Sequence, residues 1–216
     1  MMQTRILVAD DHSLVRQGIR GLFASDPTLS IIAEASNGLE AVSLAKKHRP
    51  DIAIIDISMK ELNGIDAIQQ IVRRCPMTSI VVLSMFSDER YVNRAVRAGA
   101  KAYVLKDSAD DDLIRAIRAL REGNTFFSPA IAKVLLDAHS RTLEGTAAED
   151  RYELLTERER EIYQMLAEGK TNKAIASALG LSIHTVETHR VRIMAKLDLH
   201  NSAELALSAV RRGIIA

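Results

Sequence analysis

The chain has 216 residues, of which 47% are hydrophobic, and a formal net charge of +1. This length suits one large or two modest domains, and this apolar fraction is enough for packed cores, which excludes an intrinsically disordered protein. Cys75 is the only cysteine. An internal disulfide framework and a cysteine-built zinc site are therefore excluded.

The first residues offer no targeting signal. An apolar, strand-like run begins within a few residues of Met1, which leaves no room for the charged and apolar regions of a secretory signal. No apolar stretch approaches the roughly 20 residues that a membrane-spanning helix needs. We therefore expect a soluble, cytoplasmic protein without a membrane partner.

The first half of the chain alternates short apolar runs with segments of helical periodicity. Such alternation predicts βαβ units and a parallel sheet, here a flavodoxin-like, doubly wound α/β domain with five strands. Ser13, Asn37 and Ser87 indicate helix starts, and Gly99 a helix end. The expected strands are Arg5–Ala9, Ser30–Ala35, Asp51–Asp56, Ser79–Ser84 and Ala100–Leu105.

Acidic residues lie at the ends of two expected strands. The run Ile52–Ile55 is apolar throughout, as in strands buried on both faces, and it ends at Asp56. Asp10 and Asp11 directly follow the first strand, which is adjacent to the third in the expected strand order. Because ligands bind at the carboxyl ends of strands in open α/β sheets, these side chains are predicted to meet in one crevice. The alternative is that each carboxylate only caps the segment after its strand.

Three carboxylates in one crevice repel each other unless a cation lies among them. A set of oxygen ligands suits Mg²⁺, which retains waters and leaves room for a phosphate. Lys106 follows the fifth strand, where an ammonium could meet that phosphate, and Ser84 ends the fourth strand with a hydroxyl. Singly, Lys106 reads as a solvated side chain and Ser84 as a turn residue. Their joint placement at strand ends favours a site.

At this point the chain resembles the receiver domain of bacterial two-component response regulators, over residues 4–122. Lys60 departs from the pattern, because many receivers have proline there. The segments that carry the resemblance are Leu7–Arg16, Asp56–Met59 with Gly64, Val82–Met85 and Tyr103–Asp107.

The resemblance implies a role for each matched residue. Asp56 would accept a phosphoryl group from a sensor histidine kinase. Asp11 and Asp56 would hold Mg²⁺ together with the backbone carbonyl of Ser58, and Asp10 would bind the ion through a water. Three further residues would contact the phosphoryl group or rearrange with it, namely Lys106, Ser84 and Tyr103.

A linker is expected after the first domain. Gly123 ends the pattern of the fifth helix, which is expected over residues 110–122, and Ser128 followed by Pro129 reads as the cap and first position of a linker helix. From His139 to Arg151 the periodicity is lost, which predicts an exposed tether. The expected organisation is a receiver domain over residues 1–123, a linker helix and tether over 124–151, and a second domain over 152–216.

The second domain shows the punctuation of several short helices. Thr156 with Glu159 forms a capping box at the start of one helix. Asn172 is expected to cap a second helix, which ends at Gly180, and Ser182 to cap a third that extends to about Leu197. Two short helices joined at a glycine predict a helix-turn-helix, and the alternative is a generic helical bundle.

The third of these helices argues against a generic bundle. Val186, Ile193 and Leu197 fall on one line and are expected to face the core, opposite a mixed polar and apolar face. The stretch Lys170–Lys196 holds five cations against the single acid Glu187. This local excess is typical of a surface that binds a phosphate backbone.

Residues 155–197 are similar to the LuxR-type DNA-binding domain, on Leu155–Glu159, Gly169–Ala176 and Thr185–His189. A receiver followed by this domain identifies the chain as a NarL/FixJ-type response regulator, a transcription regulator and not an enzyme. The resemblance implies that the third helix enters the major groove of double-stranded DNA. Glu187 departs from many relatives, which have lysine there. The expected DNA contacts are Lys173, Thr185, Glu187, Thr188, His189, Val191, Arg192 and Lys196.

The last expected helix, residues 202–212, carries Leu205, Ala206, Ala209 and Val210 on one side. This side packs on its own domain or forms a dimer seam, and the resemblance favours a homodimer when the protein is phosphorylated. Two other functions compete with a phosphorylation-dependent transcription factor. One is a phosphatase-like enzyme with an aspartyl-phosphate intermediate, and the other is a regulator that binds DNA without phosphorylation.

Overall fold

The computed structural model describes residues 3–143 and 151–215. Two compact units divide the chain, one built mainly from residues 1–146 and the other mainly from residues 147–216. The expected end of the first domain at residue 123 lies inside the first unit, because β6 and α6 follow that position and still pack on the sheet.

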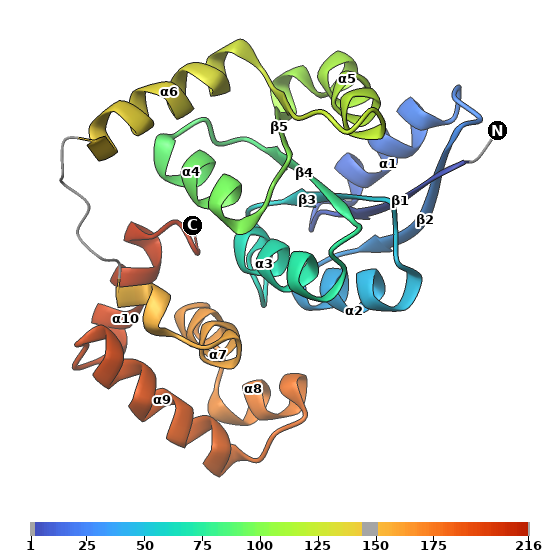
Figure 1. Cartoon of the computed structure of the whole chain (residues 1–216). Helices are drawn as coiled ribbons and strands as arrows, with labels where there is room; N and C mark the ends of the chain where they lie inside the picture. The colour runs from blue at the N-terminus through green and yellow to red at the C-terminus, as the bar shows by residue number, and fades with distance from the viewer. Residues whose placement is uncertain (1–2, 144–150, 216) are drawn as a thin grey trace. The chain divides into compact units, whose positions relative to one another are not determined.

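The first unit is a parallel sheet with the strand order β2-β1-β3-β4-β5-β6, and Figure 1 labels the first five strands along the chain, β1 to β5. All five expected strands are present, within two residues of their expected ends. The flavodoxin-like order is confirmed, but the sheet has a sixth strand that the sequence pattern did not predict, because two residues are too few to show an alternation. The strands are β1 (Thr4–Ala9), β2 (Leu29–Ala35), β3 (Ile52–Asp56), β4 (Ser79–Ser84), β5 (Ala102–Leu105) and β6 (Phe126–Phe127).

Helices cover both faces of this sheet (Figure 1). One apolar core lies between the sheet and α1 with α5, and includes Phe23 and Leu113. The other lies between the sheet and α2, α3 and α4, and includes Ile68 and Val92. Every residue of β3 is buried, as its uninterrupted apolar sequence predicts. The helices are α1 (Ser13–Phe23), α2 (Gly38–His48), α3 (Gly64–Arg74), α4 (Glu89–Ala98) and α5 (Ala109–Arg121).

The helix starts agree only in part with the expected caps. Asn37 caps α2 through its side chain, as expected, and Gly99 ends α4 with a φ of 107°. Ser13 is the first residue of α1 and not its cap. Asp88 caps α4 in place of the neighbouring Ser87. Asp and Ser are about equally good caps, so the sequence does not distinguish adjacent candidates.

The segment after α5 stays on the first unit. β6 lies parallel to β5, with Phe127 opposite Tyr103. The linker helix α6 (Pro129–Leu143) begins at Pro129, as expected, and packs against α4. Ile131, in its first turn, is fully buried in the core that α4 also covers. The linker helix therefore packs on the first unit, next to α4 and β6.

Two expectations for this linker are corrected. The hydroxyl of Ser128 is buried without a hydrogen-bond partner in the described structure, so it does not cap α6. The helix continues to Leu143, past His139, where the tether was expected to begin. The remaining tether, residues 144–150, lies outside the described residues.

The second unit consists of short helices around a small core. Tyr152 and Tyr163 are buried at its centre with their ring centroids 5.6 Å apart, and the Tyr163 hydroxyl donates to Ser208. The guanidinium of Arg160 lies 5.0 Å from the centre of the Tyr152 ring. The elements are η2 (Arg151–Leu154), α7 (Glu157–Ala167), α8 (Asn172–Leu179), α9 (Ile183–Leu197) and α10 (Ser202–Arg211).

The helix-turn-helix expected in this unit is formed by α8 and α9. Thr156 makes the complete capping box of α7, and Ser182 caps α9, both as expected. Thr171 caps α8 in place of Asn172, which is the first helical residue. Gly180 ends α8 with a φ of 63°, in the left-handed region that a glycine adopts without strain.

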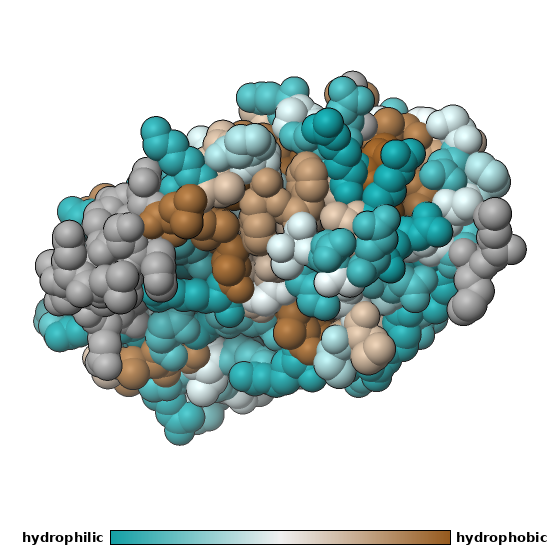
Figure 2. Space-filling model, turned by 45° about the horizontal axis from the view of Figure 1, so that its top comes forward, coloured by the Kyte–Doolittle hydropathy of each residue, from teal (hydrophilic) through white to brown (hydrophobic). Residues whose placement is uncertain are grey.

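Hydrophilic residues cover most of the face shown in Figure 2, and the hydrophobic residues between them form separate patches. Within the described residues, no helix is both long enough and apolar enough to cross a bilayer.

Candidate functional site

The carboxylates expected to converge do meet at the carboxyl edge of the sheet. Asp56 ends β3, and Asp10 and Asp11 follow β1, which pairs directly with β3. Asp10 and Asp56 are buried, and one ligand atom from each of Asp10, Asp11, His12 and Asp56 lies within 4.8 Å of the others. The sheet topology therefore assembles an acidic cluster from two segments far apart in the sequence.

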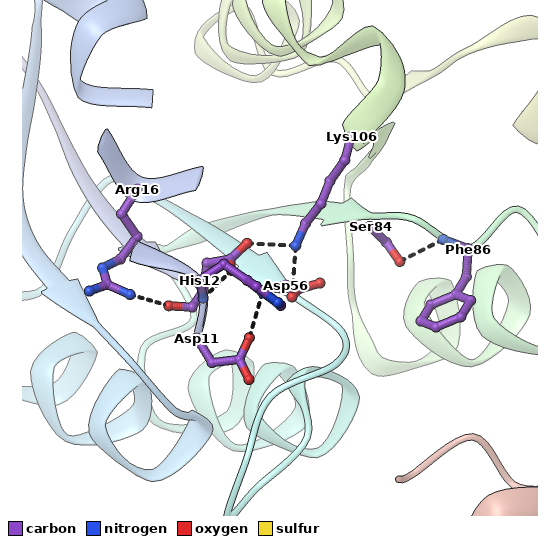
Figure 3. A network of polar contacts seen from close by, with 8 residues as sticks. Asp11, His12, Arg16, Asp56, Ser84, Phe86 and Lys106 are labelled. Carbon is purple, nitrogen blue, oxygen red and sulfur yellow. Dashed lines mark hydrogen bonds and ion pairs between the residues drawn. The ribbon is translucent and has the colours of Figure 1, made fainter. Parts of the chain in front are cut away.

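Lys106 joins this cluster from the end of β5 (Figure 3). Its Nζ atom lies 2.9 Å from Asp56 Oδ2 and 2.7 Å from Asp10 Oδ2. Burial raises the pKa of Asp56 above its usual value, and the Lys106 ammonium only partly opposes this effect. Burial acts in the opposite direction on Lys106, but its two carboxylate partners outweigh it and raise the pKa of the ammonium. One ammonium therefore faces two carboxylates, and Asp11 adds a third carboxylate to the cluster.

The residues present fit a bound Mg²⁺. Asp10 Oδ2 and Asp11 Oδ1 are buried oxygens that accept no well-aligned hydrogen bond, although Lys106 and His12 lie within ion-pair distance of them. Buried carboxylate oxygens without aligned donors are costly unless a cation approaches them. Oxygen ligands with space for water are the environment that Mg²⁺ prefers.

The acidic cluster is supported by two residues that the sequence pattern did not single out. Arg16 donates from Nη1 to the backbone carbonyl of Asp10 at 2.6 Å (Figure 3). Its Nε lies 3.3 Å from Glu34 Oε2. His12 places Nδ1 2.8 Å from Asp11 Oδ1. Arg16 lies one helical turn after His12, so its spacing from the acidic pair was a signal that could have indicated it.

The loop after β3 is closed by Gly64. Its amide donates to the carbonyl of Ile57 at 2.8 Å, and a Cβ atom at this position would lie 1.9 Å from the backbone oxygen of Asp56. Only glycine permits this approach. Lys60, where many receivers have proline, is exposed.

Ser84 ends β4 and Tyr103 lies in β5, the two strands that follow β3 in the sheet order. Ser84 is fully buried at the end of β4, and its Oγ accepts a hydrogen bond of 3.1 Å from the amide of Phe86 (Figure 3). The Tyr103 ring is fully buried in β5, and its hydroxyl donates to the carbonyl of Phe86 at 2.6 Å. Burial raises the pKa of Tyr103 far above its usual value, so this hydroxyl stays protonated as a donor.

The second candidate site is the outer face of α9. Val186, Ile193 and Leu197 are buried, which confirms the core face read from the sequence. Among the expected DNA contacts, four are exposed, namely Lys173, Glu187, Val191 and Arg192. Thr185, Thr188 and His189 are partly buried, and Thr188 Oγ1 already donates to the carbonyl of His184.

Lys196 is placed differently from the other expected contacts. Its Nζ donates to Glu159 Oε2 at 2.6 Å and to the carbonyl of Leu154 at 3.0 Å. The ammonium therefore joins the end of α9 to the start of α7 within the domain. A contact with DNA would require Lys196 to leave both partners.

Comparisons with known proteins match both domains of the chain. A model of the response regulator receiver domain matches residues 6–118, and a model of bacterial regulatory proteins of the luxR family matches residues 153–209. The uncharacterized transcriptional regulatory protein YhcZ of Bacillus subtilis is 39% identical over 96% of this chain and 95% of its own length. Oxygen regulatory protein NreC of Staphylococcus epidermidis is 36% identical, over 98% of this chain and 99% of its own length.

Solved structures of response regulators are also similar to this chain over almost its whole length. The RcsB response regulator of Salmonella typhimurium has a TM-score of 0.59 at 27% identity, over 98% of this chain and 100% of that chain. An RcsB–DNA complex has a TM-score of 0.59 at 28% identity, over 96% and 99%. RcsB has also been solved as two dimers on two parallel DNAs. The alternative of a phosphatase-like enzyme is thereby set aside. With matches in both domains and relatives above 30% identity over almost the whole length, the chain belongs to the NarL/FixJ-type response regulators, which are DNA-binding transcriptional regulators.

Proposed function

We propose that a sensor histidine kinase phosphorylates Asp56, and that this phosphorylation promotes pairing of two copies of the chain and binding to double-stranded DNA. The contact between Lys106 and both Asp56 and Asp10 is the observation that supports the proposal most strongly. A partly buried cation beside a strand-end carboxylate would meet the oxygens of a phosphoryl group attached to that carboxylate.

The proposed transfer makes one bond and breaks one. An oxygen of Asp56 bonds to phosphorus while the P–N bond to the kinase histidine breaks, and the histidine nitrogen keeps the electron pair. A bound Mg²⁺ would supply charge neutralisation for the transferred group. Asp11, Asp56 and the carbonyl of Ser58 would hold the ion directly, and Asp10 through a water. Lys106 would pair with one phosphoryl oxygen.

The transfer adds about 1.5 to 2 negative charges at the end of β3. Ser84 is the hydroxyl donor nearest in the sheet order, so it would turn toward a phosphoryl oxygen, and Tyr103 would change with it. We propose that this shifts the surface built from α4, β5 and α5 between two arrangements. In one of these arrangements, the surface would bind a second copy of the chain.

For the DNA-binding unit, we propose that α9 lies in the major groove. Glu187, Thr188 and Val191 would lie nearest base edges, where a carboxylate accepts from cytosine and methyl groups contact thymine. Lys173 and Arg192 are exposed and would contact phosphates. We assign a lesser part to three expected contacts, because the Lys196 ammonium is engaged by Glu159, the Thr185 hydroxyl is engaged by Ser182, and Nδ1 of His189 is buried.

The last helix, α10, has both buried and exposed apolar residues. Leu205 and Ala209 are buried in the domain, whereas Leu207 and Val210 expose about half of their surface, 50% and 49%. The apolar side expected from the sequence therefore packs on its own domain in part. We propose that Leu207 and Val210 form the seam between two DNA-binding units, as two-fold pairing on inverted half-sites would require.

The phosphoacceptor is tested by labelling with a small phosphodonor in the presence of Mg²⁺. The parent and an Asp51→Asn variant should label equally, because the amide oxygen of the new side chain would still accept the hydrogen bond from the Arg5 amide. Asp56→Asn should not label, and undiminished labelling would sink the assignment. DNA affinity is then compared at fixed salt with and without the donor, on duplexes selected from a random library. Equal affinities would favour a regulator that works without phosphorylation.

A further inference from the structure

Phe86 holds both of the residues that are expected to respond to phosphorylation. Its amide donates to Ser84 Oγ at 3.1 Å, and its carbonyl accepts from the Tyr103 hydroxyl at 2.6 Å. Figure 3 shows Phe86 directly beyond Ser84, on the far side from Lys106. The peptide groups of one loop residue are thus tied to a buried hydroxyl on each of two neighbouring strands, β4 and β5.

The side chain of Phe86 connects this loop to α4. Its ring stacks on the ring of Tyr91, with centroids 4.4 Å apart and planes inclined by 15°. Tyr91 lies in the first turn of α4 and packs against the core that contains Tyr103 and Ile131. The stack therefore joins the loop to the helix, and the helix to the core that the linker helix α6 also covers.

The Ser84 hydroxyl is directed toward Phe86 and not toward Asp56 (Figure 3). A hydroxyl has one donor and two acceptor positions, and Ser84 Oγ now accepts from the Phe86 amide. Turning Oγ toward Asp56 moves these acceptor positions away from that amide. The loop therefore has to move with Ser84 or lose this hydrogen bond, and the loss of a bond to a partly buried amide costs free energy.

We propose that Phe86 is a positioning residue, and that the Phe86–Tyr91 stack carries a movement of Ser84 into α4. This inference rests on the proposed phosphorylation of Asp56. An aromatic pair in this geometry changes an equilibrium between two arrangements by roughly 2- to 12-fold beyond its buried area. Met85, between Ser84 and Phe86, is 62% exposed and has no place in this connection.

The experiment compares hydrogen exchange of the α4 segment, residues 89–98, before and after phosphorylation with a small phosphodonor and Mg²⁺. Intact mass gives the phosphorylated fraction of each sample. The variants Phe86→Leu and Tyr91→Leu keep apolar volume but remove the stack. We expect both to be phosphorylated like the parent and to lose at least half of the change in α4 exchange. Tyr91→Phe, which keeps the ring, and Met85→Leu should retain the full change.

The double variant Phe86→Leu/Tyr91→Leu decides whether the two rings act as one contact. If they do, the double variant loses no more of the response than either single variant. Losses that simply add, or a full response in both single variants, would overturn the inference while leaving the phosphoacceptor in place. An unlabelled parent would instead contradict the proposed function and this inference with it. Should Phe86→Leu loosen α4 before phosphorylation, Tyr91→Leu makes the same comparison from the helix side.

Discussion

At the residue scale, the acidic cluster depends on groups that make no bond to a phosphoryl group. Arg16 fixes the backbone carbonyl of Asp10, and Gly64 lets the loop after β3 pass against the backbone of Asp56. Such supporting contacts decide whether the carboxylates are held in the geometry that the transfer requires. They can be changed without altering any proposed metal ligand.

Gly64→Ala should abolish phosphorylation of Asp56. The added Cβ would lie 1.9 Å from the Asp56 backbone oxygen, and no side-chain movement can relieve a contact with backbone, so the loop has to shift. Labelling with a small phosphodonor measures the effect. Gly18→Ala in α1 is the matched control, because its Cβ would meet nothing within 4 Å. That variant should label normally and be more stable by roughly 0.5–1 kcal/mol.

Arg16→Met should slow phosphorylation and weaken Mg²⁺ binding, since the Asp10 carbonyl loses its donor at 2.6 Å. Arg20→Met is the comparison, because Arg20 pairs with the same Glu34 at 3.2 Å and is 53% exposed. Mg²⁺ titration followed by the chemical shifts of residues 10–12 measures binding. Equal affinities in the two variants would contradict the role given to Arg16.

At the scale of elements, the sequence predicts what periodicity and strand-end chemistry encode. All five long strands and the helix-turn-helix follow from apolar patterning and capping residues, and Asp10, Asp56 and Lys106 follow from their positions at strand ends. The short strand β6 and the length of α6 do not follow, because their position is decided by packing against β5 and α4. The contact of Lys196 with Glu159 does not follow from the sequence pattern either, since it joins two helices that are distant in the sequence.

The Glu159–Lys196 contact makes the stability of the second unit depend on pH. Burial acts to raise the pKa of Glu159, but the bonds from Lys196 and Thr156 outweigh it and hold the pKa below its usual value. Because the pKa is lower in the folded state, the ionised carboxylate stabilises the domain above the unfolded pKa, about 4.3. This contribution is lost as the pH falls through the folded pKa.

Glu159→Gln should therefore destabilise α7 at pH 7 by roughly 1 kcal/mol, the usual cost of a weakened cap, and by less as the pH falls below about 4. Hydrogen exchange of residues 157–167 at several pH values measures the difference in the full chain. Glu157→Gln removes a charge from the same helical turn and leaves the Lys196 contact in place. A difference between Glu159→Gln and the parent that stays constant with pH would be inconsistent with the ion pair as its source.

At the scale of the whole molecule, the net charge of +1 says little about DNA, because the cations are concentrated locally. Lys173 and Arg192 are exposed on the helix-turn-helix, and Glu187 is the only acid between Lys170 and Lys196. Arg192→Met should weaken binding to selected and scrambled duplexes by a similar factor. It should also lower the slope of log affinity against log salt by about 1, as loss of one phosphate contact does. Fluorescence anisotropy over a range of salt concentrations measures both.

Glu187→Gln should change the affinities for the two duplexes by different factors, because Glu187 is proposed to contact bases whereas Arg192 is proposed to contact phosphates. Removing the carboxylate relieves repulsion from the phosphates, so affinity for a scrambled duplex should rise at every salt concentration. A selected duplex should gain less or lose affinity, since a good base contact contributes about 1–3 kcal/mol of discrimination. The ratio of the two affinities at fixed salt should therefore narrow. If both duplexes gained equally, Glu187 would act only through its charge, and base reading by α9 would rest on Thr188 and Val191.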